Sequence, residues 1–324
     1  MRQKLAWLAL AAIVLAALPF PLSEPHTVEL ATVGAYFIAI LGVDLLGRHA
    51  GEVSLGHGGF MAVGAYTTAT LTADHGVRDL WTIPAAAAVA GGVGLLAGLP
   101  GLRVSGLSFA LASLGIAVAA PTTLRRFDHL TGGSRGIALF GKSTQTGHGL
   151  GVLGLTNGQW LYALTWTVGV ACFLVLWAIL ASSFGRSLHA VRDSELAAAA
   201  AGVNRPAVKL AAFGISAALA GIAGSLLAID VAYVSPHTFP IQLSLYLLVG
   251  SVAGLYGSIW GAVLGALLVQ YLSRLVGLVP HVDTSRAGPA TFFFGATLVA
   301  LMLALPLVLR SAAAIARRGH ARPH

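Results

Sequence analysis

The sequence predicts an all-α polytopic membrane protein with about 8–10 transmembrane helices, some of them short or broken. Its composition is the first indication, because 57% of the 324 residues are hydrophobic and only 9% are charged. A typical soluble domain has about 25% charged residues. The mean hydropathy is +0.84. A soluble chain of this length would need many more charged side chains to cover its surface. We therefore do not expect a soluble enzyme, a DNA-binding protein or a secreted disulfide scaffold.

The second indication is a series of apolar runs that approach the length of a membrane span. A helix needs about 20 mainly apolar residues to cross the ~30 Å hydrocarbon core. Ten runs qualify, at 5–22, 28–46, 54–71, 83–99, 107–124, 160–180, 210–228, 243–255, 259–272 and 289–309. The third, eighth and ninth are short or rich in glycine, which is typical of broken or re-entrant segments that protein or a water-filled cavity covers.

The first run resembles a signal peptide in its basic start at Arg2 and Lys4. We interpret it as a retained span, because it is longer than a usual signal core and ends in Leu-Pro-Phe-Pro at 18–21. No soluble domain interrupts the runs. Residues 1–324 are therefore predicted to form a single transmembrane domain, with polar connections at 125–159 and 182–206.

The distribution of Lys and Arg predicts the orientation of the chain. These residues stay on the cytoplasmic side of a membrane. Ten spans with the amino terminus inside place 12 of the 19 basic residues on the cytoplasmic side. Both termini and the 182–206 loop are then cytoplasmic, and 125–159 is external. This topology accounts for the net charge of +8, so no nucleic-acid binding is expected. The single cysteine, Cys172, excludes an internal disulfide and a cysteine-built zinc site.

The chain has 40 glycines, and those of the later predicted spans recur every three or four residues, which is helical spacing. Small side chains at this spacing let two helix backbones approach closely in a membrane. The predicted helix-packing positions are Gly221, Gly224, Gly250, Gly254, Gly257, Gly261 and Gly265. Tight packing of the bundle and a sliding surface of a transporter are both compatible with these stripes.

Residues 136–143, Gly-Ile-Ala-Leu-Phe-Gly-Lys-Ser, match the P-loop pattern of nucleotide-binding proteins. A P-loop must follow a buried strand and open a helix. Here the pattern follows a glycine-rich loop and leads into Thr-Gln-Thr-Gly-His-Gly at 144–149. We therefore expect no nucleotide site.

Two polar stretches are the candidates for function. The first, 51–66, places a hydroxyl, an imidazole and several glycines at the start of an apolar run. Polar groups within a membrane are default functional candidates. His57 fits both a pore-lining role and a helix-packing hydrogen bond, and it has no partner at metal-ligand spacing, so no metal site is expected.

The second stretch, 182–206, is too long for a tight turn and is rich in helix-forming residues that end at Gly202. Leu188, Val191 and Leu196 give it an apolar side. We predict a small helix on the cytoplasmic face whose apolar side docks on another protein. A solvated connector is the alternative.

These stretches resemble the inner-membrane permease subunits of branched-chain amino acid ABC transporters, in particular the LivM-like branch. Residues 54–66 resemble the family signature S-L-G-H-x-x-F-x-x-x-G-A-Y, and 131–136 resemble its T-G-G-x-x-G loop. Residues 185–204 resemble the coupling loop, one of the EAA-type motifs of importer permeases, and the glycines of 221–265 resemble later family segments. The resemblance covers about residues 35–270, in the family's order.

The resemblance implies a non-enzymatic subunit of the bacterial inner membrane, with no cofactor of its own. Its partners would be a second homologous permease, two cytoplasmic ABC ATPase subunits, an extracytoplasmic solute-binding protein and the lipid bilayer. The implied lining of the translocation path is Ser54, Gly56, His57, Phe60, Gly64 and Tyr66. The implied ATPase-coupling residues are Gly185, Arg186, Arg192, Asp193, Glu195 and Gly202.

The chain departs from the family pattern in the coupling loop, at Asp44 and at Arg48-His49, where a glycine-aromatic pair is usual. The alanine run at 197–201 lacks a second acidic residue that is usual in the coupling loop. Asp44 stands where an amide is common, and we predict that it pairs with Arg48, one helical turn away.

Two other functions remain open at this point. A permease for urea or short amides would share the fold and the motifs, because the binding protein largely selects the solute. An ion-coupled secondary carrier would need ionisable residues at mid-membrane. The predicted spans hold almost none, since Asp44 and Glu29 lie near span ends.

Overall fold

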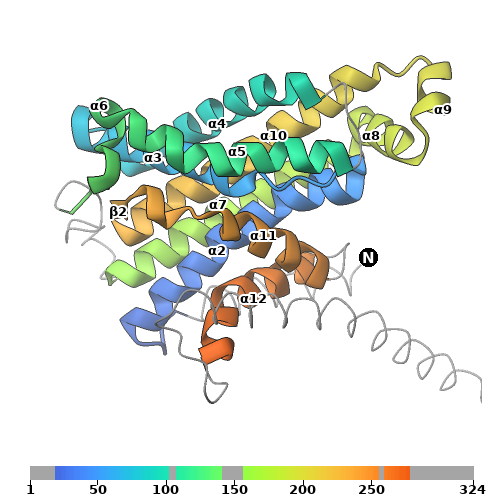
Figure 1. The fold of residues 1–324 in the computed structure, drawn as a ribbon. Coiled ribbons are helices and arrows are strands. Elements are labelled where there is room, and N and C mark those ends of the chain that lie inside the picture. The colour runs from blue at the N-terminus through green and yellow to red at the C-terminus, as the bar shows by residue number, and fades with distance from the viewer. Residues whose placement is uncertain (1–18, 102–106, 141–155, 255–258, 278–324) are drawn as a thin grey trace, which may run out of the picture.

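The computed structural model describes residues 19–101, 107–140, 156–254 and 259–277 (Figure 1). Within these ranges the chain is largely helical, which confirms the predicted all-α class. The helices longer than ten residues are α2 (Glu24–Asp44), α3 (His57–His75), α4 (Asp79–Gly101), α5 (Leu107–Arg126), α7 (Asn157–Ala181), α8 (Ser183–Asp193), α10 (Arg205–Val231), α11 (Ile241–Ala253) and α12 (Ile259–Gly277). The shorter elements are the π-helix η1 (Leu45–Ala50), α6 (Asp128–Thr131), η2 (Gly133–Arg135), β1 (Ile137–Ala138), α9 (Glu195–Ala200), β2 (Tyr233–Val234) and η3 (Pro236–Thr238).

Five of the described helical segments are long and apolar enough to cross a membrane. They are Glu24–Ala50, Asp79–Pro100, Ser108–Arg126, Asn157–Ala181 and Arg205–Val231. These segments contain or closely overlap the predicted runs 28–46, 83–99, 107–124, 160–180 and 210–228. The chain is therefore a multi-pass membrane protein.

The remaining predicted runs differ from simple spans. The third run forms α3, which has 19 residues but carries a histidine, glycines and several threonines that lower its hydropathy. The eighth run forms α11, whose 13 residues rise only about 20 Å and cannot cross the hydrocarbon core alone. The ninth forms α12, and residues 5–18 and 289–309 of the outermost runs lie outside the described residues.

Helix α10 is the central helix of the bundle because it carries small residues on two sides. In the most apolar 18-residue stretch of α10, 83% of the residues are buried in the protein. The corresponding fraction in α5 is 22%. A side chain at Gly224 would overlap the carbonyl oxygen of Met61 in α3. Gly221 lies against the backbone of Gly64 on one side and against Ala90 of α4 on the other. These contacts allow α3 and α4 to pack directly on the α10 backbone.

Helices α11 and α12 form an antiparallel pair through glycines. A side chain at Gly265 would overlap the carbonyl oxygen of Gly250, and one at Gly254 would overlap the carbonyl oxygen of Gly261. The two backbones therefore approach closely along their length. Gly257, also predicted to pack helices, lies outside the described residues.

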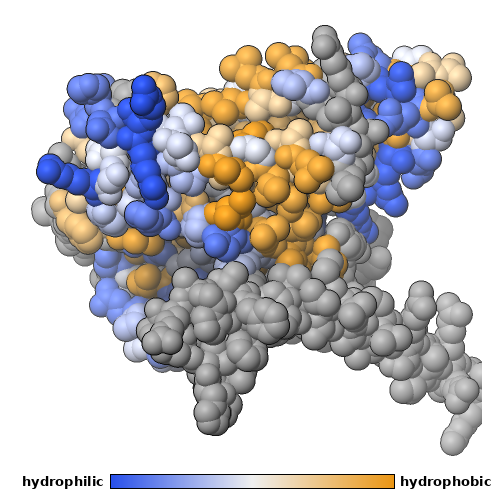
Figure 2. Space-filling view, in the orientation of Figure 1, coloured by the Kyte–Doolittle hydropathy of each residue, from blue (hydrophilic) through white to orange (hydrophobic). Residues whose placement is uncertain are grey.

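The polar connections lie at opposite ends of the bundle (Figure 1). At one end, α6 and η2 lead into β1, which pairs antiparallel with β2 in the register Ile137↔Val234. At the other end lie α8 and α9. An apolar band occupies the surface between two hydrophilic ends (Figure 2), as a membrane-embedded bundle requires.

The P-loop look-alike does not have the structural context of a nucleotide site. Gly136 follows the 3-10 turn η2 and leads into β1, so the strand lies inside the pattern and not before it. Lys142 and Ser143 lie outside the described residues.

Candidate functional site

The 182–206 loop folds into two helices, where the sequence predicted one. The Ser182 hydroxyl accepts a hydrogen bond from the Phe184 N–H and begins α8. Ser194 has an extended backbone, and its hydroxyl accepts from the Ala197 N–H to begin α9. Ser194 therefore acts as an N-cap that divides the predicted helix. Gly202 follows the end of α9, and its φ of +81° favours glycine.

Glycine at 185 lets α8 turn back against the end of α7. A side chain there would overlap the carbonyl oxygen of Leu180. The turn carries the rest of α8 over the end of the bundle, where Arg186 is exposed.

Only part of the predicted apolar side of the loop is available to a partner. This corrects the prediction that the whole side docks on another protein. Leu188 and Val191 are buried in the protein itself. Leu196 instead is 80% exposed, and the alanines around it, apart from Ala198, are exposed as well. The break at Ser194 explains the difference, because it rotates α9 away from the bundle while α8 stays packed on it.

An ion-pair network fixes the base of α9. The Lys209 ammonium lies 2.6 Å from Oε1 of Glu52 and 2.6 Å from Oε1 of Glu195. The Arg205 guanidinium lies 3.4 Å from Oε2 of Glu195. The side chains of Glu52 and Lys209 are only 7% and 13% exposed. Because charges this buried are costly unless they are paired, the network holds α9, the start of α10 and the residues before α3 together.

Two further contacts join α8 to the end of η1. Nδ1 of His49 forms a hydrogen bond with Nε2 of His189, at a distance of 2.8 Å. Gly51 has a φ of +72°, and the aliphatic part of Arg192 lies against it. The Arg192 head group is half-exposed and lies 3.9 Å from the exposed Asp193 carboxylate.

Glu52, Lys209, His49 and His189 were not among the residues that the sequence singled out as sites. A signal existed for Lys209, which follows Arg205 by one helical turn, and for Glu52, which lies two residues before the signature stretch. Their pairing joins residues 157 positions apart, so no local pattern predicts it.

The signature stretch 54–66 leads into α3 and forms hydrogen bonds with α5, α10 and α11. The His57 Nε2 lies 2.7 Å from the Ser216 hydroxyl of α10, and that hydroxyl donates to the Gly42 carbonyl at 2.7 Å. Since the single hydroxyl proton goes to Gly42, the Nε2 of His57 carries a proton and donates. The Gly58 N–H donates to the Ser244 hydroxyl of α11 at 2.9 Å.

The other signature residues pack within the same junction. Ser54 is buried, and its hydroxyl accepts from the Gly56 N–H at 3.3 Å. Phe60 meets Phe213 edge-to-face, with 5.5 Å between the ring centres. Tyr66 is buried, six residues after Phe60 and two after the Gly64 contact with α10. The assignment of these residues to the translocation path stays a prediction.

The predicted Asp44–Arg48 ion pair is not among those that the described residues form. The Asp44 Oδ1 accepts a hydrogen bond from the Ser251 hydroxyl of α11 instead. The α11 helix supplies this donor from a neighbouring element, which an argument from spacing along one helix could not include.

Comparisons with known proteins give one family. A family model described as "Branched-chain amino acid transport system / permease component" matches residues 28–308. Two relatives carry the name high-affinity branched-chain amino acid transport system permease protein LivM. The protein of Escherichia coli strain K12 is 32% identical over 295 residues, and that of Salmonella typhimurium strain LT2 is 33% identical over 296. Each alignment covers 85% of this chain and 69% of the relative. No solved structure matches the chain.

Proposed function

Because the chain belongs to the family of permease components of branched-chain amino acid transport systems, we propose that it forms the translocation path of an ATP-driven importer. The solute in this proposal is a branched-chain or related amino acid. The whole chain acts as one transmembrane domain of the bacterial inner membrane, and the end that carries α8 and α9 is cytoplasmic. A second permease, two ATPase subunits and an external binding protein complete the transporter.

The observation that carries this proposal is the shape of the α8–α9 end. Leu196 is 80% exposed on a helix whose base is held by ion pairs from Glu195 to Arg205 and Lys209. Lys209 also pairs with Glu52. An exposed apolar side chain on a fixed support suits a docking element, because little ordering is needed when a partner binds. In this proposal α9 enters the ATPase surface and α8 connects it to the bundle.

The signature stretch supplies the second part of the proposal. It lies where α3 contacts α10 and α11, and its polar groups use hydroxyls from those neighbours. Relative movement of these helices would change the junction directly, so the stretch is positioned to shape the path during the transport cycle.

The test is co-purification of the chain with its ATPase, followed by ATP-driven leucine uptake in proteoliposomes. Burial of a leucine side chain contributes about 1.5–3 kcal/mol, so Leu196→Asp should weaken ATPase binding by roughly 10- to 100-fold. The matched control is Phe140→Asp, which changes an exposed apolar side chain two residues after β1, away from α8 and α9. Wild-type ATPase retention by Leu196→Asp would contradict the docking role of α9.

A further inference from the structure

A cavity of about 370 Å³ lies between α2 with η1, the second half of α7, and α12. Its size falls in the range of about 300–1,000 Å³ that is usual for small-molecule sites. It lies toward the end of the bundle that carries α8, because His49 lines the cavity and also contacts His189.

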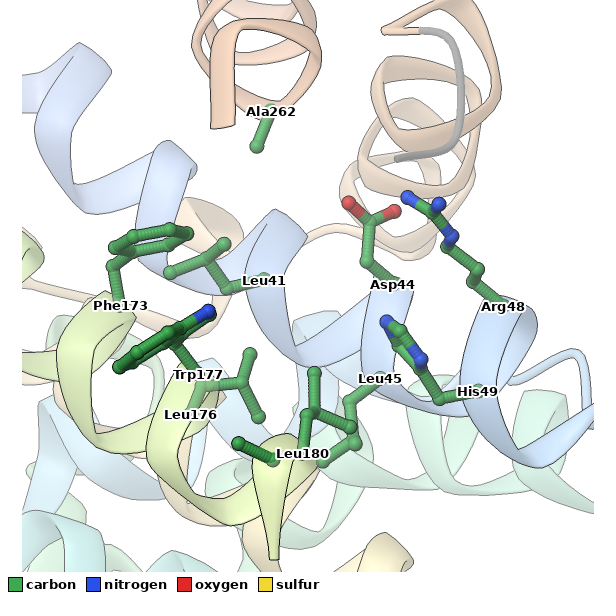
Figure 3. A pocket seen from close by; sticks show the side chains of 11 residues that line it. Leu41, Asp44, Leu45, Arg48, His49, Phe173, Leu176, Trp177, Leu180 and Ala262 are labelled. Carbon is green, nitrogen blue, oxygen red and sulfur yellow. The ribbon is translucent and has the colours of Figure 1, made fainter. Parts of the chain in front are cut away.

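The cavity wall is divided into a charged side and an apolar side (Figure 3). Asp44 ends α2, and Arg48 and His49 lie about one turn later in η1. All three lie on one side of the cavity. Phe173 and Trp177 of α7 lie on the other, beside Leu41. An amphipathic wall of this kind matches a ligand that carries charges at one end and a hydrocarbon group at the other.

The two charged groups lie beside each other on the charged side of the cavity (Figure 3). Asp44 is held by a hydrogen bond from Ser251, and it forms no direct ion pair with Arg48 among the described residues. A carboxylate binds an ammonium group, and a guanidinium binds a carboxylate through two parallel hydrogen bonds. An α-amino acid carries these two complementary groups on adjacent atoms.

We propose that this cavity is a solute-binding site for a zwitterionic amino acid with an apolar side chain. Asp44 binds the α-ammonium group, Arg48 binds the α-carboxylate, and the side chain lies between Leu41, Phe173 and Trp177. The inference rests on the proposed transport function and adds a binding site within the membrane domain. It also excludes urea and short amides from this site, because they carry neither charge.

One residue of the cavity wall, His49, also contacts the 182–206 loop. The hydrogen bond between His49 and His189 joins the wall of the site to α8. A solute in the cavity would therefore contact the same short helix η1 that supports the coupling loop.

Binding of radiolabelled L-leucine to the nanodisc complex of permease and ATPase subunits, without the binding protein, tests the site. Asp44→Asn and Arg48→Gln should each weaken leucine binding by roughly 10- to 100-fold, as the loss of a charged hydrogen bond does. The asparagine keeps an acceptor for Ser251. Matched controls are Asp74→Asn and Arg125→Gln, which change exposed charges at helix ends.

Competing ligands give a readout that a folding defect cannot imitate. In the wild type, leucinol, which lacks the carboxylate, and 4-methylpentanoate, which lacks the ammonium group, should compete much less well than leucine. Asp44→Asn should lose the preference for leucine over 4-methylpentanoate, and Arg48→Gln the preference over leucinol. If Asp44→Asn does not reach the membrane, the Arg48→Gln arm decides.

Two results would overturn the site. One is wild-type leucine affinity with unchanged preferences in the variants that reach the membrane. The other is equal competition by leucine, leucinol and 4-methylpentanoate in the wild type, which would indicate an apolar cavity for acyl chains. Failure of the proposed function is distinct, because it would appear as absent ATP-driven uptake by the wild-type complex.

Discussion

Replacement of Lys209 by methionine tests whether the buried ion pair with Glu52 stabilises the junction between α10 and α3. Methionine has a similar length and no charge, so the change removes the ammonium group and keeps most of the packing. The Glu52 side chain is 7% exposed and lies 2.6 Å from that ammonium. Removal of one member of a buried ion pair costs about 3–5 kcal/mol, because a buried charge loses its compensating partner.

The second contact of Lys209 should add little to this cost. The Glu195 side chain is 40% exposed and can turn its carboxylate to water when Lys209 is replaced. Exposed ion pairs contribute about 0–1 kcal/mol. We therefore expect Lys209→Met to lower the free energy of unfolding by about 3–5 kcal/mol in total, nearly all of it through Glu52.

The matched double variant separates charge from packing. Glu52→Gln combined with Lys209→Met leaves a neutral pair, and replacement of both members of a buried pair is often close to neutral. The double variant should therefore be more stable than Lys209→Met alone, with a coupling free energy of about 2–3 kcal/mol. Arg205→Gln is the control, because Arg205 and Glu195 are both more than one-third exposed and the change should cost at most about 1 kcal/mol.

Titration with a denaturing detergent in mixed micelles gives the free energies of unfolding. The four proteins to compare are Lys209→Met, Glu52→Gln, the double variant and Arg205→Gln. The reasoning is refuted if the double variant is as unstable as the sum of the two single variants. That result would mean that the pair is not coupled, and that the loss in Lys209→Met comes from packing of the side chain.

Two further predictions concern the bundle and its orientation. Gly224→Ala should cost about 2–3 kcal/mol and reduce the yield of monodisperse protein, since its methyl group would overlap the carbonyl oxygen of Met61. Gly92→Ala, with open space around it, should leave the size-exclusion profile unchanged, and equal profiles for both variants would contradict the packing account. Reporter fusions after Leu196 and Ser134 should report opposite sides of the membrane, with the former cytoplasmic. An external signal after Leu196 would remove the basis for ATPase docking.

The apolar runs predicted the long helices because the signal and the structure share one cause. A segment such as 160–180 is apolar on all sides since lipid and protein both surround it, and it forms most of α7. The glycine spacing likewise predicted close contact, and Gly265 lies against Gly250. Both features are visible along a single segment.

The partners of Glu52 and Asp44 could not be predicted from the sequence, because each pair joins segments that are far apart in the chain. Lys209 at the start of a span looks like an orientation signal, since basic residues collect on the cytoplasmic side. Its partner Glu52 is 157 positions away. Asp44 was assigned to Arg48 by helical spacing, while Ser251 approaches from another helix. The break at Ser194 was not predicted, because the alanine run after this serine favours a continuous helix, although serine is a common N-cap residue.

The ion pairs connect the 182–206 loop to the signature stretch. Lys209 binds Glu195 at the base of α9 and Glu52 five residues before His57 at the start of α3. His57 in turn donates to Ser216, which lies two turns beyond Lys209 on α10. A displacement of α9 by a bound partner would therefore reach the α3–α10 contact through Lys209, which bonds Glu195 on one side and the buried Glu52 on the other. We infer that weakening the pair at Glu52 would reduce the coupling of ATP hydrolysis to transport more than it reduces ATPase binding.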